Sequence, residues 1–115
     1  MTDLSIIVVT YKEGLDVLKA CFDSVAASSN IRYELIIVDN GASAATKGLL
    51  SSYDHATYLR NEENKGFAAA VNRGMKQGTG RYHLLLNPDT AFAPDVLARM
   101  VTHLDEDGDV GVASS

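Results

Sequence analysis

The residues best suited to chemistry follow an apolar run near the middle of the C-terminal half. Leu84 to Leu86 lead directly into Asn87, Pro88 and Asp89. Continuous hydrophobic residues are typical of a strand that is covered on both faces, as in a parallel sheet. Pro88 has no N–H to give to a sheet, so the strand should end before it. Asn87 and Asp89 are therefore expected at the edge where open α/β sheets bind ligands, and a carboxylate held there suits a hard divalent cation.

Three further polar segments follow expected strands. They contain Thr10, Tyr11 and Glu13; Asp39 and Asn40; and Asn64 and Gly66, with Asn72 one turn further on. Because the carboxyl ends of parallel strands share one edge, we expect all four segments to converge there. A tyrosine ring can face a flat base, and Asp39 can accept from a nucleobase N–H or a ribose hydroxyl. Gly66 permits close backbone approach at a helix N-terminus, which attracts phosphate.

Each segment taken alone also has an ordinary structural interpretation. Glu13 would cap a helix, Asp39 would close an Asx turn and Asp89 would cap backbone N–H groups. Arg73 is interpreted as a solvated side chain on a capped surface helix. The order of the four segments and their shared edge favour a binding site over four unrelated turns.

Alternating hydrophobic patterns predict the elements that position these segments. We expect strands at 4–9, 34–38, 56–59, 81–86 and 109–113. Helices are expected at 15–25, 44–53 and 94–104, and a further helix from 67 to near Gly78 or Gly80. Ser43 is expected to cap the second helix, and Pro94 to open the last one. This order predicts an α/β, Rossmann-like fold with a mostly parallel sheet, helices on both faces and right-handed crossovers.

The bulk composition indicates one globular domain. The chain has 115 residues, of which 46% are hydrophobic and 22% charged. Its net charge is −5 and it has no basic stripe, which argues against nucleic-acid binding. The single cysteine, Cys21, excludes an intrachain disulfide and is expected to be a buried, inert thiol. Because neither a signal peptide nor an apolar run of about 20 residues is visible, we expect a cytoplasmic protein without a membrane segment.

Four motifs together resemble the nucleotide-sugar half of family 2 glycosyltransferases, across nearly the whole chain. They are Ile6-Ile7-Val8-Val9-Thr10-Tyr11, Ile36-Ile37-Val38-Asp39-Asn40, Asn64-Lys65-Gly66-Phe67-Ala68-Ala69-Ala70-Val71-Asn72 and Leu85-Leu86-Asn87-Pro88-Asp89-Thr90. The Asn-Pro-Asp variant is similar to the bacterial rhamnosyltransferase-like branch. Each motif alone is modest, but the ordered set is specific.

This resemblance implies a GT-A fold, a nucleoside-diphosphate sugar donor of the UDP or dTDP type, and Mg²⁺ or Mn²⁺. It implies that Thr10 and Tyr11 contact the base and that Asp39 reads the base or the ribose. Asn64 and Gly66 match the loop near the donor. Asp89 matches the last acid of the family's Asp-x-Asp motif, which binds the metal that bridges the diphosphate.

Four more residues complete the expected nucleotide-sugar-binding set, and they are Glu13, Asn40, Asn72 and Asn87. Asn87 replaces the first acid of the Asp-x-Asp motif, which removes one formal charge and predicts weaker metal affinity. In inverting members a general base deprotonates the acceptor hydroxyl, and no residue of this chain matches it. The catalytic base is therefore expected downstream, and His55, His83 and His103 are expected to be solvated or structural.

The abrupt C-terminus predicts that residues 1–115 are the donor-binding portion of a GT-A domain whose acceptor half is absent. The complete enzyme would transfer a sugar, with inversion, to a hydroxyl of a glycan or lipid-linked acceptor, and missing regions would place it peripherally at the inner membrane. The fragment alone is expected to be inactive. Its exposed edge predicts a homo-oligomer. The alternative is a non-catalytic nucleotide-binding or assembly module with the same fold.

Overall fold

Strands and helices alternate along the chain in the order that the hydrophobic pattern predicts. The computed structural model describes residues 1–107 and 112–114. The elements are β1 (Leu4–Thr10), α1 (Leu15–Ala26), β2 (Tyr33–Asp39), α2 (Ala44–Leu50), β3 (Ala56–Arg60), α3 (Phe67–Gln77), β4 (Tyr82–Leu85), α4 (Val96–Asp107) and β5 (Val112–Ser114). Of the fifth strand expected at 109–113, residues 109–111 lie outside the described part.

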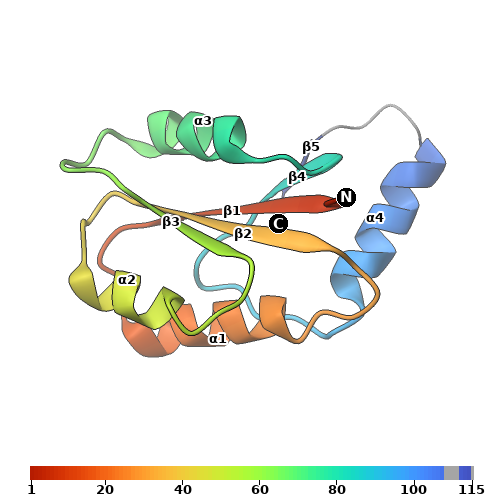
Figure 1. The fold of residues 1–115 in the computed structure, drawn as a ribbon, viewed down its shortest axis with the longest axis horizontal. Helices are drawn as coiled ribbons and strands as arrows, with labels where there is room; N and C mark the ends of the chain where they lie inside the picture. The colour runs from red at the N-terminus through yellow and green to blue at the C-terminus, as the bar shows by residue number, and fades with distance from the viewer. Residues whose placement is uncertain (108–111, 115) are drawn as a thin grey trace.

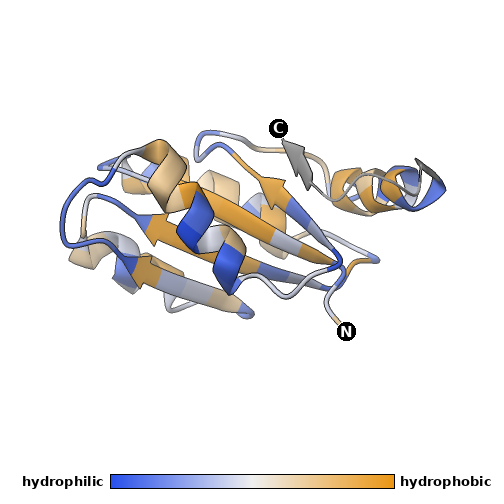
Figure 2. Ribbon diagram, turned by 90° about the horizontal axis from the view of Figure 1, so that it is seen from above, coloured by the Kyte–Doolittle hydropathy of each residue, from blue (hydrophilic) through white to orange (hydrophobic). Residues whose placement is uncertain are grey.

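The strands form one sheet in the order β3-β2-β1-β4-β5, and all neighbouring strands run parallel. The register pairs Thr10 with Asp39 and Asp39 with Arg60, so β1, β2 and β3 end side by side. The loops that follow these three strands lie together at the left of Figure 1. Figure 2 shows the same loops as hydrophilic, beyond strands that are mostly hydrophobic.

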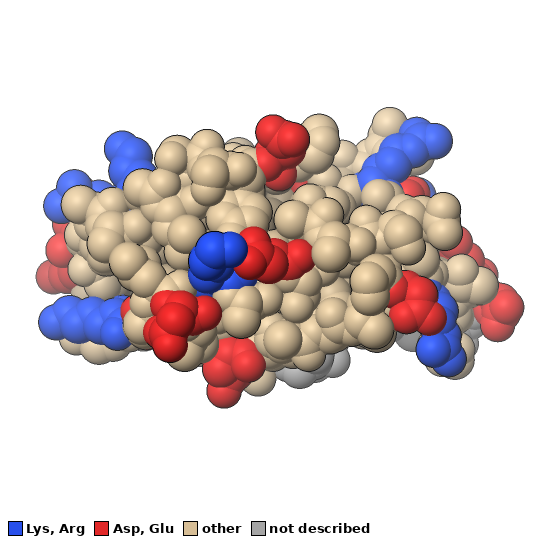
Figure 3. All heavy atoms as spheres, turned by 90° about the horizontal axis from the view of Figure 1, so that it is seen from below, with Lys and Arg blue, Asp and Glu red and all other residues tan. Residues whose placement is uncertain are grey.

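Both faces of the sheet are covered, which confirms the expected α/β layering. Alternate residues of β1 face opposite cores: Ile6 and Val8 pack with α1, whereas Ile7 packs with α3. In Figure 1, α3 covers one face, and α1 and α2 cover the other. Acidic and basic side chains are interspersed on the α1–α2 side (Figure 3).

The second and the last helix differ by more than one residue from the sequence-based expectation. The second helix ends at Leu50 instead of Tyr53, because Ser51 and Ser52 turn their hydroxyls onto carbonyls of the preceding turn. Its N-cap is Ser43 as expected, whose hydroxyl accepts from the Thr46 N–H at 3.2 Å. The last helix begins at Val96, since Pro94 lies in the preceding turn, and it ends at Asp107, three residues beyond the expected end.

The close contact between α3 and the sheet depends on a glycine, and this gives a first prediction. A Cβ at Gly74 would lie 2.6 Å from Ile7 Cγ2 and 3.2 Å from Val38 Cγ2. Gly74→Ala should therefore push α3 away and lower the free energy of unfolding by about 1–3 kcal/mol in urea titrations. Gly48→Ala in α2 is the matched control, since no atom lies within 4 Å of its added Cβ. Equal stability of the two variants would contradict this packing.

Candidate functional site

A shallow pocket of about 340 Å³ lies at the carboxyl edge of the sheet, and we call it the edge pocket. It is lined by Val9, Thr10, Tyr11, Glu13, Asn40, Asn64, Gly66, Phe67 and Pro88. These residues come from the ends of β1 and β2, from the β3–α3 loop and from the segment after β4. The structure thus brings together six of the residues expected at the site, although their contact with a ligand stays a prediction.

The rim of the edge pocket is aromatic. Tyr11 is 47% exposed and Phe67 is 57% exposed, and both line the pocket. The Lys12 ammonium lies 5.2 Å from the centre of the Tyr11 ring, within cation–π range. Exposed ring faces beside a polar floor are suited to a flat, partly apolar ligand such as a nucleobase.

Asp39 lies behind this pocket and is 1% exposed. Its Oδ1 accepts from the Thr10 hydroxyl at 3.1 Å and from the Gly41 N–H at 2.9 Å. Its Oδ2 accepts from the Ser43 N–H at 2.8 Å and from the Tyr58 hydroxyl at 2.6 Å. Four donors use the acceptor capacity of a carboxylate, so in this structure Asp39 shapes the loop. Direct reading of a base or ribose by Asp39 would require one of these donors to leave.

Tyr58 is a site residue that the sequence analysis missed. Burial, together with its hydrogen bond to Asp39 and the charge of that carboxylate, raises the pKa of Tyr58. That Tyr58 contacts Asp39 follows only from the register between β2 and β3. The residue paired with Asp39 is Arg60, which lies two positions after Tyr58 and therefore on the same face of the sheet.

A second network links the β2 and β3 loops to α3. Arg73 Nη1 donates to the Arg60 carbonyl and to Asn61 Oδ1, each at 2.6 Å. Asn61 Nδ2 donates to Asn40 Oδ1 at 2.6 Å, and Asn40 Nδ2 donates to the Gly66 carbonyl at 3.4 Å. Arg73 is exposed on α3, as expected, but its guanidinium also donates to two acceptors and so does more than face solvent. Asn61 was also missed.

Local hydrogen bonds shape the two loops on either side of the edge pocket. Glu13 accepts from the Tyr11 N–H at 2.6 Å and does not cap α1, whose N-cap is Gly14. Asn64 Oδ1 accepts from the Gly66 N–H at 2.8 Å. Gly66 has φ +87°, a left-handed conformation that favours glycine, so this loop requires glycine at the start of α3.

Four expected site residues do not line the edge pocket: Asp39, which lies behind it, Asn72, Asn87 and Asp89. Asn72 is exposed on α3, one turn beyond the pocket. Asn87 is exposed after β4, and its carbonyl accepts from the Thr90 N–H at 3.1 Å. Their roles toward a nucleotide sugar stay predictions, and any contact would depend on how a ligand extends beyond the pocket.

Asp89 is exposed in the loop between β4 and α4, where a metal ion can reach it. Within the part of the chain that the structure describes, no three His, Cys, Asp or Glu side chains converge on one metal position. Mg²⁺ is commonly held by one or two carboxylates together with substrate phosphates and water. A single accessible carboxylate therefore fits a metal that is bound together with a diphosphate.

Cys21 lies beneath this loop, and its state gives a second prediction. Burial, helped by the charge of Asp89, raises the pKa of the Cys21 thiol to about 11. Relative to a thiol with the ordinary pKa of 9.0, the thiolate fraction at pH 8 falls about 100-fold. Cys21 should therefore resist iodoacetamide in the native protein and react quickly in urea, as followed by intact-mass spectrometry. Equal rates in the two states would contradict its burial.

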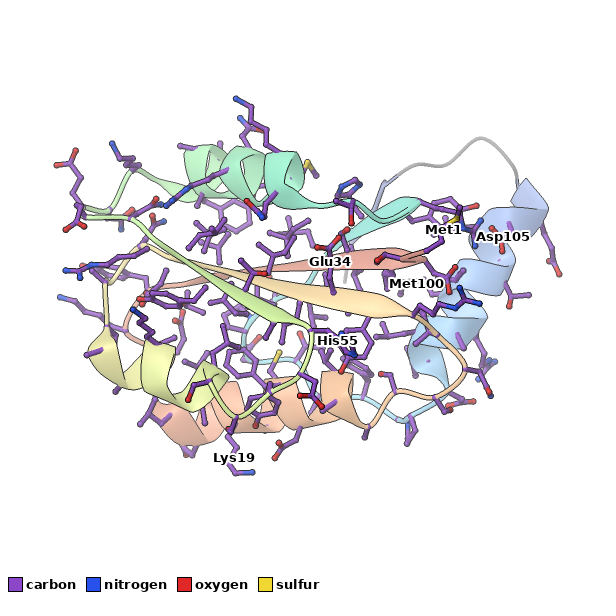
Figure 4. The ribbon with its side chains drawn as sticks, viewed as in Figure 1. Met1, Lys19, Glu34, His55, Met100 and Asp105 are labelled. Atoms are coloured by element: carbon purple, nitrogen blue, oxygen red, sulfur yellow. The ribbon has the colours of Figure 1, made fainter. Side chains whose placement is uncertain are left out.

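A larger cavity, of about 660 Å³, lies at the opposite end of the molecule and includes Asp3, Arg81 and Asp105 among its lining residues. Figure 4 labels Asp105 on α4 at this end, away from the loops that follow β1, β2 and β3. Arg81 contacts Asp105 at 2.8 Å and Asp3 at 3.4 Å. The pair with Asp105 joins α4 to the residue before β4, and the pair with Asp3 joins the segments before β4 and β1, so both pairs have a structural role.

Comparison with known proteins decides the family. The model of glycosyl transferase family 2 matches residues 5–115. The chain belongs to glycosyl transferase family 2. The comparison does not distinguish a rhamnosyltransferase-like branch within this family. Among curated relatives, the dolichol-phosphate mannosyltransferase of Pyrococcus furiosus is 27% identical over 96% of this chain and 32% of its own length. The chain thus spans about a third of the length of this relative.

Solved structures confirm the fold of this family 2 chain. TarS residues 1–349 from S. aureus, in complex with UDP-GlcNAc, align with a TM-score of 0.82 and 22% identity, over 91% of this chain and 32% of that 1–349 chain. PcManGT, a mannosyltransferase from Pyrobaculum calidifontis in complex with GDP-Man and Mn²⁺, aligns with a TM-score of 0.79 and 24% identity, over 88% of this chain and 32% of the PcManGT chain. No helix among the described residues is both long and apolar enough to span a bilayer.

Proposed function

We propose that this family 2 chain is the donor-binding portion of an inverting glycosyltransferase that uses a UDP- or dTDP-sugar. The observation that carries the proposal is the edge pocket, which gathers residues from four separate chain segments where open α/β sheets bind ligands. The expected roles of the individual residues agree with its shape. Tyr11 and Phe67 would flank the base, while Thr10 and Asn40 would supply polar groups at the floor.

The phosphates are proposed to lie toward Gly66 and Asp89. Gly66 begins α3 in the edge pocket, and the N-terminus of a helix favours anions. Asp89 would hold Mg²⁺ or Mn²⁺ against the diphosphate. The metal, when bound, would stabilise the negative charge that develops on the departing nucleoside diphosphate. Two relatives support these assignments, because one was solved with UDP-GlcNAc and the other with GDP-Man and Mn²⁺.

Residues outside this chain would complete the enzyme. The chain spans about a third of the length of two curated relatives. We therefore assign the acceptor site and the general base to sequence outside these 115 residues. The Asn87-Pro88-Asp89 variant supports placement in the rhamnosyltransferase-like branch. The acceptor is proposed to be a glycan or lipid-linked hydroxyl, and the site of transfer the cytoplasmic side of the inner membrane.

Titration calorimetry of the full chain tests the donor proposal. UDP and dTDP should each be titrated with Mn²⁺ and again with EDTA, and at least one should bind saturably and more tightly with the metal. Binding that is unchanged by EDTA would contradict the metal's proposed role. If neither nucleotide binds under either condition, the donor proposal fails. Binding without transfer in a longer chain that contains the acceptor half would favour the non-catalytic module.

A further inference from the structure

The hydrogen bonds of Arg73 indicate a role at the edge pocket, although Arg73 is not one of the residues that line this pocket. Arg73 and Asn61 line a separate cavity of about 410 Å³. None of its lining residues is shared with the edge pocket. Three hydrogen bonds nevertheless connect Arg73 to the edge pocket, because Asn40 and Gly66 belong to both the network and the lining.

The two ends of this network have fixed polarity. A guanidinium can only donate, so Asn61 must turn its Oδ1 toward Arg73. A carbonyl can only accept, so Asn40 must turn its Nδ2 toward Gly66. Between them, Asn61 Nδ2 donates to Asn40 Oδ1 at 2.6 Å, which is the only amide orientation compatible with both ends. Arg73 at one end and the Gly66 carbonyl at the other thus favour the same direction for both amides.

The Asn61 and Asn40 side chains are buried, so a change in the direction of their amides would be costly. Asn61 is 4% exposed and Asn40 is 5% exposed, so water cannot replace a lost partner without rearrangement of the loops. Gly66 is held on both sides, since Asn64 accepts from its N–H and Asn40 donates to its carbonyl. The position of the β3–α3 loop against the β2 end is therefore linked to the direction of the amides.

We infer that Arg73 is a positioning residue for nucleotide binding. Acting through Asn61, it holds the Asn40 amide and the Gly66 backbone in the orientation that the donor's base and phosphates meet. This inference rests on the proposed donor site and extends it to residues outside the edge pocket. It predicts that nucleotide affinity depends on the charge and the hydrogen-bond donors of residue 73, although this residue does not contact the nucleotide.

Four variants of the full chain separate the network from a simple loss of stability. Arg73→Met removes the donor, and Arg73→Lys keeps a cationic donor. Asn61→Asp keeps an acceptor for Arg73, but its second oxygen would turn the Asn40 amide over and set Asn40 Oδ1 against the Gly66 carbonyl. Lys76→Met removes an exposed charge one turn further along α3 and is the matched control. All four are first compared by thermal melting.

The readouts are UDP and dTDP affinity with Mn²⁺, and the NMR signals of the Asn40 side-chain amide and the Gly66 N–H. Arg73→Met and Asn61→Asp should weaken binding about tenfold and move both signals, while Arg73→Lys and Lys76→Met stay near wild type. Unchanged affinity and unmoved signals in Arg73→Met and Asn61→Asp would overturn the inference. If the wild type binds no nucleotide, the donor proposal fails, and the two NMR signals alone decide whether Arg73 positions the loop.

Discussion

Replacing Asp39 with alanine is expected to lower the free energy of unfolding by about 3–5 kcal/mol. The carboxylate is 1% exposed and accepts from four donors, so its removal leaves the Gly41 and Ser43 N–H groups without their partner. The Tyr58 hydroxyl also loses its acceptor at 2.6 Å. Urea unfolding followed by circular dichroism measures the change.

Two companion variants test whether the effect comes from the network around Asp39. Asp39→Asn keeps one acceptor oxygen but sets an NH₂ group against a donor, so it should lie between wild type and alanine. Tyr58→Phe removes one of the four donors and should lower stability by about 1.5–3 kcal/mol, as for a hydrogen bond to a charged group. A loss below about 1 kcal/mol for Asp39→Ala would mean that this carboxylate does not organise the loop.

Replacing Asp89 with asparagine is expected to remove most of the gain in UDP or dTDP affinity that Mn²⁺ provides, about 10- to 100-fold. The amide is a neutral and weaker ligand, and Asn87 already stands where the related motif has an acid. Calorimetry with and without Mn²⁺ measures the effect. Because Asp89 is exposed, melting temperature should change little.

Two other substitutions sharpen the metal assignment. Asp95→Asn removes another exposed acid close along the chain, near the start of α4, and should leave metal-dependent binding intact. Asn87→Asp restores the second acid and should strengthen Mn²⁺-dependent binding. If Asp89→Asn and Asp95→Asn bind alike, the metal is held elsewhere.

The positions of the functional loops were predictable because they follow from the order of the elements. Leu4 to Val9 and Leu84 to Leu86 carry the apolar pattern of strands covered on both faces. The first run lies in β1, and the second begins in β4, which ends at Leu85. Once parallel strands are inferred, their carboxyl ends share an edge, and this places Thr10 near Asn40 without any knowledge of side chains.

The partners of the polar side chains were not predictable in the same way. Tyr58 reaches Asp39 because of the β2–β3 register, and a sequence pattern does not give the register of neighbouring parallel strands. Arg73 is counted as exposed, yet its guanidinium is fixed by Asn61 and a backbone carbonyl. Helical spacing indicates which face a side chain leaves from, but it does not indicate where a long side chain ends.

NMR chemical-shift mapping tests most directly whether these loops form one nucleotide-sugar site. Titration of the labelled chain with UDP or dTDP and Mg²⁺ should move the signals of Thr10, Tyr11, Asn40 and Gly66 together, with one shared affinity. Replacing Mg²⁺ with paramagnetic Mn²⁺ should broaden signals around Asp89 most strongly. Shifts that gather instead around Arg81 at the opposite end, or no saturable shifts with either nucleotide, would contradict a shared site at the carboxyl edge of the sheet.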